Sequence, residues 1–184
     1  MRNPDEDDFV AYVTGRLPAL RRVAVQLAGD AHRGDDLVQQ AITRLYTRWR
    51  RVSRNEHLDA YVYKILLRVF LDERRLRWST VRLGTSPADL AQRAAADRAS
   101  TGVEDPAAGV GDRMLLREAL ALLPAKQRAA VVLRFLADRS IEEVAEILNV
   151  SAGTVKSQTH DGLTALRRLL GAQNGTDMSP GVRT

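Results

Sequence analysis

The sequence predicts an all-α fold with two small helical domains joined by a flexible linker. Apolar residues recur at helical spacing along most of the chain, whereas the period-two alternation of strands is nearly absent. Hydrophobic residues make up 45% of the 184 residues, which is enough to build a buried core. The helical pattern lapses over residues 79–111, where glycine and proline are frequent, and this separates domains at 1–78 and 112–171. On such a linker the domains should move independently until they bind a partner.

Three helices are expected in the first part of the N-terminal domain. A short one covers residues 9–14, and a second begins near Pro18, because proline fits the first turn of a helix. Asp35 or Asp36 is expected to cap the third helix. That helix carries one apolar stripe, formed by Leu37, Ala41, Leu45 and Trp49.

A fourth helix is expected from Asp59 to Trp78, after a short loop over residues 50–57. Steps of three and four place one set of residues on a common face: Tyr61, Lys64, Arg68, Leu71, Arg75 and Trp78. The opposite side carries the residues expected to face the core: Val62, Ile65, Leu66, Val69 and Leu76. The first face combines cations, which bind phosphates, with rings, which stack on bases, so it suits opened or single-stranded DNA. The alternative is a second packed seam with incidental arginines.

The charge distribution also favours a polyanionic partner. Residues 44–82 contain eleven Arg or Lys and only four acidic residues, although the net charge of the whole chain is a modest +5. Such a local excess of positive charge attracts nucleic acid. The alternative is a charged face that only contacts solvent.

A helix-turn-helix is predicted in the C-terminal domain, after two helices within residues 113–136. A capping box formed by Ser140 and Glu143 begins its first helix. Asn149 tolerates the positive φ that the turn needs, and Val155, six residues later, is expected to be buried. A small residue four positions before the turn lets the two helices cross closely, which completes the spacing of the motif.

The second helix of this motif is expected to expose short polar side chains. The residues expected at its surface are Ser151, which also caps the helix, Ala152, Thr154, Lys156, Ser157 and His160. Hydroxyls and a lysine near a helix N-terminus suit phosphates and base edges in a major groove of DNA. The alternative is a solvated helical hairpin without a ligand. The tail over residues 172–184 is expected to be disordered.

Composition argues against several classes of protein. The chain contains no cysteine, which removes disulfide scaffolds and thiolate zinc sites. Its three histidines, His32, His57 and His160, lack metal-ligand spacing, and neither a phosphate-binding glycine loop nor a nucleophile elbow is present. We therefore expect neither enzymatic activity nor a metal or cofactor. The acidic start and the absence of a long apolar run predict a cytoplasmic protein without membrane insertion.

Three segments, in this order, resemble the extracytoplasmic-function (group 4) sigma factors of bacterial RNA polymerase. The first, DDLVQQAITRLYTRW, resembles the polymerase-binding helix of that family. The second, AYVYKILLRVFLDERRLR, resembles its promoter-melting helix. The third resembles its C-terminal DNA-reading unit and reads LLPAKQRAAVVLRFLADRSIEEVAEILNVSAGTVKSQTHDGLTALRRLL. The resemblance implies a promoter-specificity factor that binds core RNA polymerase and promoter DNA, with an anti-sigma factor as a further candidate partner.

The resemblance also implies roles for individual residues. Docking on the clamp of the polymerase falls to Asp36, Leu37, Gln39 and Gln40. The loop over residues 51–57 captures a flipped base of the minus-ten element and contains Arg51, Ser53, Arg54, Asn55 and His57. The opened strand is lined by Lys64, Arg68 and Arg75, beside Tyr61. The minus-thirty-five element is read by Lys156, Ser157 and His160, with Ser151 and Thr154 nearby.

Three positions depart from the family pattern, and they bear on promoter choice. The family often has an acidic residue at the position of Gln40, asparagine at that of Arg68 and a basic residue at that of Asp161. The alternative function is a stand-alone helix-turn-helix regulator. That alternative leaves the basic fourth helix and the DDLVQQ segment unexplained.

Overall fold

The computed structural model describes residues 4–82 and 110–174, and every regular element in these two ranges is a helix. The all-α prediction is therefore confirmed. Most of the expected linker and of the expected C-terminal tail lies outside the described residues. Within residues 4–82 and 110–174, no helix is both long enough and apolar enough to span a membrane.

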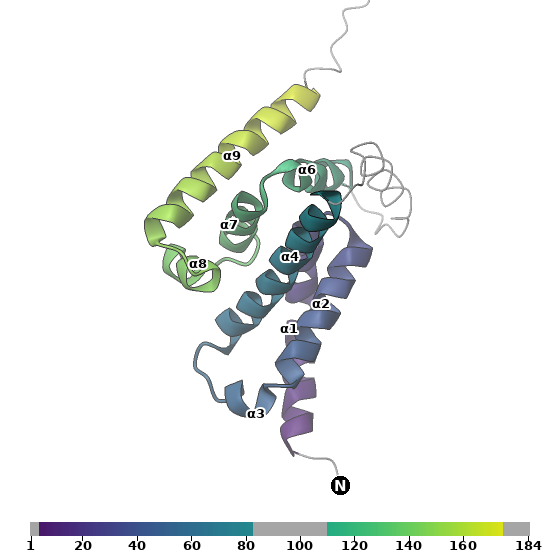
Figure 1. The fold of residues 1–184 in the computed structure, drawn as a ribbon, viewed down its shortest axis with the longest axis vertical. Helices are drawn as coiled ribbons and strands as arrows, with labels where there is room; N and C mark the ends of the chain where they lie inside the picture. Colours follow the sequence, from purple (N-terminus) through teal and green to yellow (C-terminus); the bar gives the residue numbers. More distant parts are fainter. Residues whose placement is uncertain (1–3, 83–109, 175–184) are drawn as a thin grey trace, which may run out of the picture.

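The described residues form four helices in each half of the molecule. The first half contains α1 (Pro4–Ala28), α2 (Ala31–Tyr46), α3 (Trp49–Val52) and α4 (Leu58–Arg82). The second half contains α6 (Val110–Leu122), α7 (Ala125–Phe135), α8 (Ile141–Leu148) and α9 (Ala152–Asn174). In the first half α1, α2 and α4 pack side by side, and α3 closes one end of this group (Figure 1). In the second half α9 packs across α6, α7 and α8.

The prediction of two separate helices, one over residues 9–14 and one from Pro18, is wrong, because the structure has the single helix α1 there. It is continuous from Pro4 to Ala28 and has Pro18 in its interior. Proline has no N–H to donate to the carbonyl four residues earlier, that of Thr14. Both residues lie on the exposed side of the helix, where water can hydrogen-bond to the freed carbonyl. The proline is therefore tolerated without ending the helix.

The start of α2 differs from the expected one by several residues. The N-cap is Asp30, whose carboxylate accepts a hydrogen bond of 2.7 Å from the backbone N–H of Arg33. Asp35, one of the two expected caps, instead forms an ion pair of 2.6 Å with Arg21 of α1, and Asp36 is exposed. The apolar stripe is confirmed for Leu37, Ala41 and Leu45, which are buried on α2. Trp49 is also buried, but it begins the separate helix α3.

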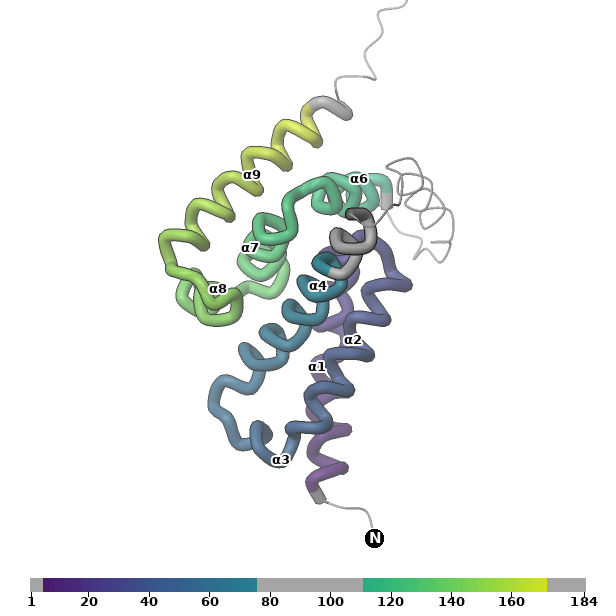
Figure 2. The backbone as a smooth tube through the Cα atoms, viewed as in Figure 1, coloured from purple at the N-terminus to yellow at the C-terminus, as the bar shows by residue number. Residues whose placement is uncertain are grey.

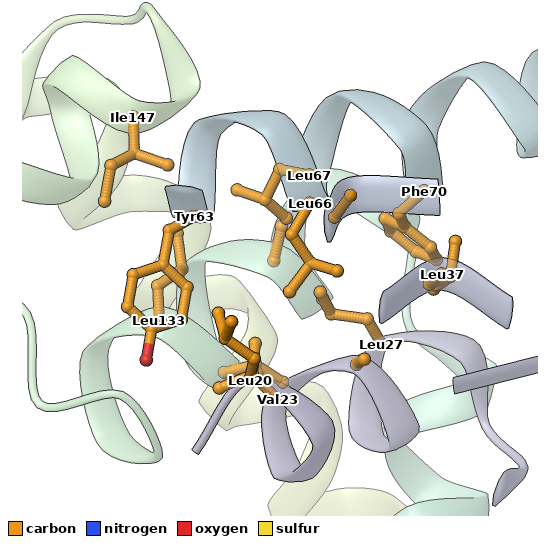
Figure 3. Packing of buried hydrophobic residues seen from close by; sticks show 14 of the residues in the cluster. Leu20, Val23, Leu27, Leu37, Tyr63, Leu66, Leu67, Phe70, Leu133 and Ile147 are labelled. Atoms are coloured by element: carbon orange, nitrogen blue, oxygen red, sulfur yellow. The ribbon is translucent and has the colours of Figure 1, made fainter. Parts of the chain in front are cut away.

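The helix α4 is buried along two stripes instead of the single one predicted. The expected core-facing residues are buried where their side chains are described: Val62, Ile65, Leu66 and Val69. Beside them a second buried stripe is formed by Tyr63, Leu67 and Phe70. Figure 3 shows these α4 side chains between Leu27 and Leu37 of the first half and Leu133 and Ile147 of the second. One hydrophobic core therefore extends through both halves.

A buried arginine connects the two halves. Arg128 of α7 is 2% exposed, and its Nη1 donates a hydrogen bond of 2.6 Å to the carbonyl of Leu27, in the last turn of α1. Its Nη2 donates to the carbonyls of Ala121 and Leu123, at the end of α6. The guanidinium carbon also lies 5.9 Å from the ring centroid of Phe70 on α4. The two halves are thus in direct contact in this structure, and their independent movement stays a prediction.

The crossing of α1 and α2 depends on Gly34, and we expect its replacement to destabilise the fold. In Gly34→Ala the added Cβ would lie 2.8 Å from the Cα and 2.9 Å from the N of Val25, backbone atoms that cannot turn away. We expect a loss of about 1–3 kcal/mol in the free energy of unfolding, measured by chemical denaturation.

The matched control is Gly15→Ala, because Gly15 also lies in a helix interior but nothing within 4 Å would meet its Cβ. This variant should be more stable than the wild type by roughly 0.5–1 kcal/mol. Equal effects of the two substitutions would show that helix propensity, and not the close crossing, determines stability at Gly34.

Candidate functional site

The α2 surface presents a polar stripe at the place where the resemblance puts polymerase docking. Asp36, Gln39 and Gln40 are all exposed on this helix. Gln40 is also held from the side, because its Nε2 donates a hydrogen bond of 3.0 Å to Glu73 on α4. Three of the four proposed docking residues are thus brought together at one accessible surface.

The fourth docking candidate, Leu37, is not part of that surface. Its side chain is 0% exposed and packs in the core. The reason is helical periodicity, since Leu37, Ala41 and Leu45 repeat at intervals of four residues and all turn inward. Leu37 therefore supports the polar stripe from below, and direct contact with a partner is excluded in this conformation.

The segment between α3 and α4 is a short ordered loop with its polar residues outward. Arg54, Asn55 and His57 are exposed in this loop, and Ser53 is half-buried. Arg51, which was expected in the loop, is exposed in α3. Asn55 shapes the loop, because its Oδ1 accepts a hydrogen bond of 2.9 Å from the backbone N–H of His57. The chain then enters α4 at Leu58, so this loop leads directly onto the basic face of that helix.

The cations of the first half divide into paired and unpaired groups. Five arginines form ion pairs with Asp or Glu side chains: Arg16, Arg21, Arg33, Arg44 and Arg50. Within the part of the chain that the structure describes, those without a carboxylate partner are Arg22, Arg48, Arg51, Arg54, Lys64, Arg68 and Arg75. Five of these seven belong to the expected minus-ten surface, and Tyr61 lies half-buried on the same helix face. Unpaired cations keep their charge available for phosphates.

The helix-turn-helix has the predicted local geometry. Ser140 and Glu143 form a complete capping box at the start of α8. Asn149 has φ 55° and ψ 52°, the left-handed conformation expected at the turn. Val155 is 0% exposed and anchors α9 against the rest of the motif. The backbone trace in Figure 2 turns sharply between α8 and α9 at this point.

The five candidate reading residues of α9 fall into two groups. Three hydroxyls are engaged locally. Those of Ser151 and Thr154 are hydrogen-bonded to each other at 2.9 Å, and Ser151 Oγ also accepts from the backbone N–H of Thr154 at 3.1 Å. Ser157 Oγ donates to the carbonyl of Thr154 at 3.0 Å. Lys156 and His160 are exposed, and neither has a polar partner within the described residues. Asp161 is exposed beside them. Lys156 and His160 are therefore the side chains most available to a ligand.

The orientation of α9 is set by its contact with α7. Gly162 is buried there, and a Cβ at this position would lie 2.7 Å from Cγ2 of Val131. Beyond this contact the two helices diverge and leave a groove of about 650 Å³, between α9 and the α6–α7 turn. His160 lines one edge of this groove, with Leu122 on the opposite wall.

Two residues with a central place in the structure were missed by the sequence interpretation. Arg128 is the buried link between the halves. Arg139, between α7 and α8, lies 3.8 Å from Asp59 of α4, and its guanidinium carbon is 5.0 Å from the ring centroid of Tyr63. The sequence did contain a sign of this contact between the halves. Tyr63, Leu67 and Phe70 are spaced so that they form a second apolar stripe on α4, which needs a second packing partner.

Metal binding finds no support in the described residues, which contain no group of three or more His, Asp or Glu able to hold an ion. Two ionisable groups stabilise the local structure instead, Tyr12 and Glu143. Burial, followed by a hydrogen bond from its hydroxyl to Asp59 at 2.8 Å, raises the pKa of Tyr12 far above its ordinary value. The hydrogen bond from the backbone N–H of Ser140 lowers the pKa of Glu143, which stabilises the charged form in the capping box.

Comparison with protein families gives two matches in succession. Residues 12–80 match the family model "Sigma-70 region 2". Residues 113–166 match the model "Sigma-70, region 4". The first match covers the polar stripe of α2 and the basic face of α4, and the second covers the helix-turn-helix.

Individual relatives agree with these matches over nearly the whole chain. The RNA polymerase sigma-E factor of Streptomyces coelicolor is 38% identical over 167 residues, which cover 91% of this chain and 88% of the relative. The ECF RNA polymerase sigma factor SigW of Bacillus subtilis is 27% identical over 177 residues, 92% of each chain. Among solved structures, the sigma factor RpoE from Bartonella quintana, in complex with the anti-sigma factor NepR, superposes with a TM-score of 0.68. It is 27% identical and the alignment covers 89% of this chain and 97% of that one.

Proposed function

Because the chain belongs to the extracytoplasmic-function sigma factors of RNA polymerase, we propose that its three exposed polar surfaces carry out the separate tasks of such a factor. The protein binds core RNA polymerase and directs transcription initiation at promoters. A stand-alone regulator is not favoured, because the region 2 match accounts for the first half of the chain. Each task is assigned to its own set of residues.

In this proposal, the polar stripe of α2 binds polymerase. Asp36 and Gln39 are exposed and Gln40 is fixed by Glu73, so the stripe is accessible and already ordered. An ordered surface loses little conformational freedom on binding, which favours affinity. Leu37 contributes by holding the helix against the core and not by contact.

Promoter opening falls to the loop after α3 and the outer face of α4. The observation that supports this assignment most directly is the set of unpaired cations, because five of the seven cations without a carboxylate partner in the described part of the first half belong to this surface. Lys64, Arg68 and Arg75 bind the phosphates of the opened strand, and Tyr61 offers a ring for stacking. Arg54 and His57 stand at the loop, where a flipped base is captured.

Upstream recognition falls to α9. Lys156 and His160 are four residues apart and therefore point into the same groove of DNA. Ser151 and Thr154 bond to each other, so their part is to order the helix N-terminus and to orient its N–H groups toward a phosphate. Asp161, exposed beside His160, repels the backbone and weakens loose binding.

The setting follows from the family. We infer that the protein acts in the cytoplasm together with polymerase, and that it has no catalytic activity of its own. An anti-sigma factor is a further candidate partner, because the solved relative RpoE is bound to the anti-sigma factor NepR.

The docking assignment predicts that charge reversal on α2 disrupts polymerase binding. The double variant Asp36→Arg, Gln39→Arg should bind core polymerase about tenfold more weakly or worse, measured by titration of labelled protein. The control is Asp112→Arg, an exposed acidic residue at the start of α6. Circular dichroism should report unchanged helicity for both. Wild-type affinity in the α2 variant would exclude this stripe as the docking surface.

The reading assignment predicts different effects for neighbouring residues of α9. Lys156→Ala should weaken transcription from all promoters alike and lower the salt slope of binding by about one, because a phosphate contact carries no sequence information. Ser157→Ala and His160→Ala should change the preferred upstream sequence, by about 1–3 kcal/mol per lost base contact.

The measurement is transcription by reconstituted holoenzyme from a library randomised in the upstream element. Arg167→Ala, an exposed cation further along α9, is the control for a general loss of charge. If neither Ser157→Ala nor His160→Ala alters the preference, α9 contacts the DNA backbone only.

A further inference from the structure

The loop over residues 53–57 connects α3 to α4, and base capture is assigned to it. The backbone N–H of Asn55 donates a hydrogen bond of 2.9 Å to the carbonyl of Val52, and that of Leu58 donates one of 3.2 Å to the carbonyl of Asn55. These bonds shape the loop locally but do not fix it to the rest of the molecule. Because α3 has only four residues, it is too short to be stable without packing. The position of the loop therefore depends on what holds α3 and the start of α4.

The first turns of α1 hold α3, which lies beside the N-terminal end of that helix (Figure 1). Trp49 begins α3 and is buried. Its ring centroid lies 5.2 Å from that of Phe9, edge to face, and 5.4 Å from that of Tyr12. Such ring contacts fix orientation as well as distance. An ion pair of 3.1 Å between Asp5 and Arg50 adds a weaker, exposed contact to the same short helix.

The next turn of α1 holds the start of α4. Asp59 is the second residue of α4, and each of its carboxylate oxygens has a partner on α1. The hydroxyl of Tyr12 donates a hydrogen bond of 2.8 Å to Oδ1, and Nη2 of Arg16 lies 2.6 Å from Oδ2. Tyr12 thus touches both ends of the connection, with its ring on α3 and its hydroxyl on α4.

The four residues of α1 that make these contacts share one face of the helix. Asp5, Phe9, Tyr12 and Arg16 follow one another in steps of four, three and four, so their side chains line up along about three turns. The residues that they hold come just before and just after the loop. Both ends of the loop are therefore fixed to a single rigid element.

We propose that this face of α1 is the positioning element for base capture, with Tyr12 as its central residue. The inference rests on the proposed function, which gives the loop a flipped base to hold. Flipping a base out of its stack costs free energy, and a site of fixed shape recovers more of that cost because it loses little freedom on binding. Tyr12 and Arg16 act through Trp49 and Asp59, without touching DNA. They sharpen the choice of base at the single position that the loop reads.

Two substitutions test this role without removing the packed rings. Tyr12→Phe deletes the hydrogen bond to Asp59 and keeps the ring, and Arg16→Gln deletes the ion pair. Arg16→Lys keeps the charge and should behave almost as the wild type. The matched control is Arg21→Gln, because Arg21 also lies on α1, is 52% exposed against 53% for Arg16, and is paired at the same 2.6 Å with a carboxylate of α2.

The first measurement is transcription by holoenzyme, reconstituted with the full-length protein, from a library randomised in the minus-ten element. His57→Ala identifies the position that the loop reads, as the one where the preference weakens. At that position Tyr12→Phe and Arg16→Gln should each lower the preference for the favoured base about two- to tenfold. Preferences at the other minus-ten positions should stay as in the wild type, and Arg21→Gln should change none of them.

The second measurement is amide hydrogen exchange in the free protein, which needs no DNA. Exchange over residues 50–60 should be faster in Tyr12→Phe and Arg16→Gln than in the wild type and in Arg21→Gln. Unchanged exchange there would overturn the positioning role, as would a wild-type preference of both variants at the position identified by His57→Ala. An equal loss of preference at every position, or in Arg21→Gln, would overturn it too, because it would indicate a general loss of stability.

Failure of the proposed function would look different. His57→Ala would then leave every minus-ten preference unchanged, even if exchange over residues 50–60 is faster in Tyr12→Phe. That result would exclude base capture by this loop and, with it, a role of α1 in positioning the loop for a base.

Discussion

The structure depends on a charge buried between its two halves. Arg128 is almost fully enclosed, and an arginine in that position is costly unless its N–H groups are hydrogen-bonded. Carbonyls from the last turns of α1 and α6, which have no partner within their own helices, accept those hydrogen bonds. Burial, together with the nearby charges of Arg74 and Arg33, lowers the pKa of Arg128 to about 9, so the group remains charged at neutral pH. The guanidinium of Arg128 and the free carbonyls at two helix ends therefore satisfy each other's need for a hydrogen-bond partner.

This contact determines where the functional surfaces lie. Arg128 places α7 against the first half, and α7 in turn positions α9 through the close approach at Gly162. The helix α4 is packed on two sides, by α2 and by α8, and its remaining side carries Lys64, Arg68 and Arg75. The polar stripe of α2 is exposed beside the contact with α4, where Gln40 donates a hydrogen bond to Glu73. The surfaces assigned to polymerase and DNA are thus the parts of each helix that the shared core leaves uncovered.

Local features of this fold were predictable from the sequence, and contacts between distant segments were not. The capping box at Ser140 and the left-handed turn at Asn149 follow from side-chain chemistry within a few residues, and both predictions are confirmed. The break expected at Pro18 is absent because solvent accepts the freed carbonyl. The contact between Arg128 and the carbonyl of Leu27 joins positions 101 residues apart, and a backbone acceptor leaves no mark in the sequence. The inward direction of Leu37, by contrast, follows from the apolar stripe that it shares with Ala41 and Leu45, and it is the docking role implied by the resemblance that this periodicity argues against.

The coupling of the halves through Arg128 is tested most directly by hydrogen exchange, followed by mass spectrometry across a denaturant series. In the wild type, peptides from α1–α4 and from α6–α9 should lose protection together, in one transition, because a single core and the buried arginine connect them. In Arg128→Met, which keeps a long side chain without the charge and its hydrogen bonds, protection of the second half should be lost at a lower denaturant concentration than that of the first. Two separate transitions in the wild type, or one shared transition in the variant, would contradict this account.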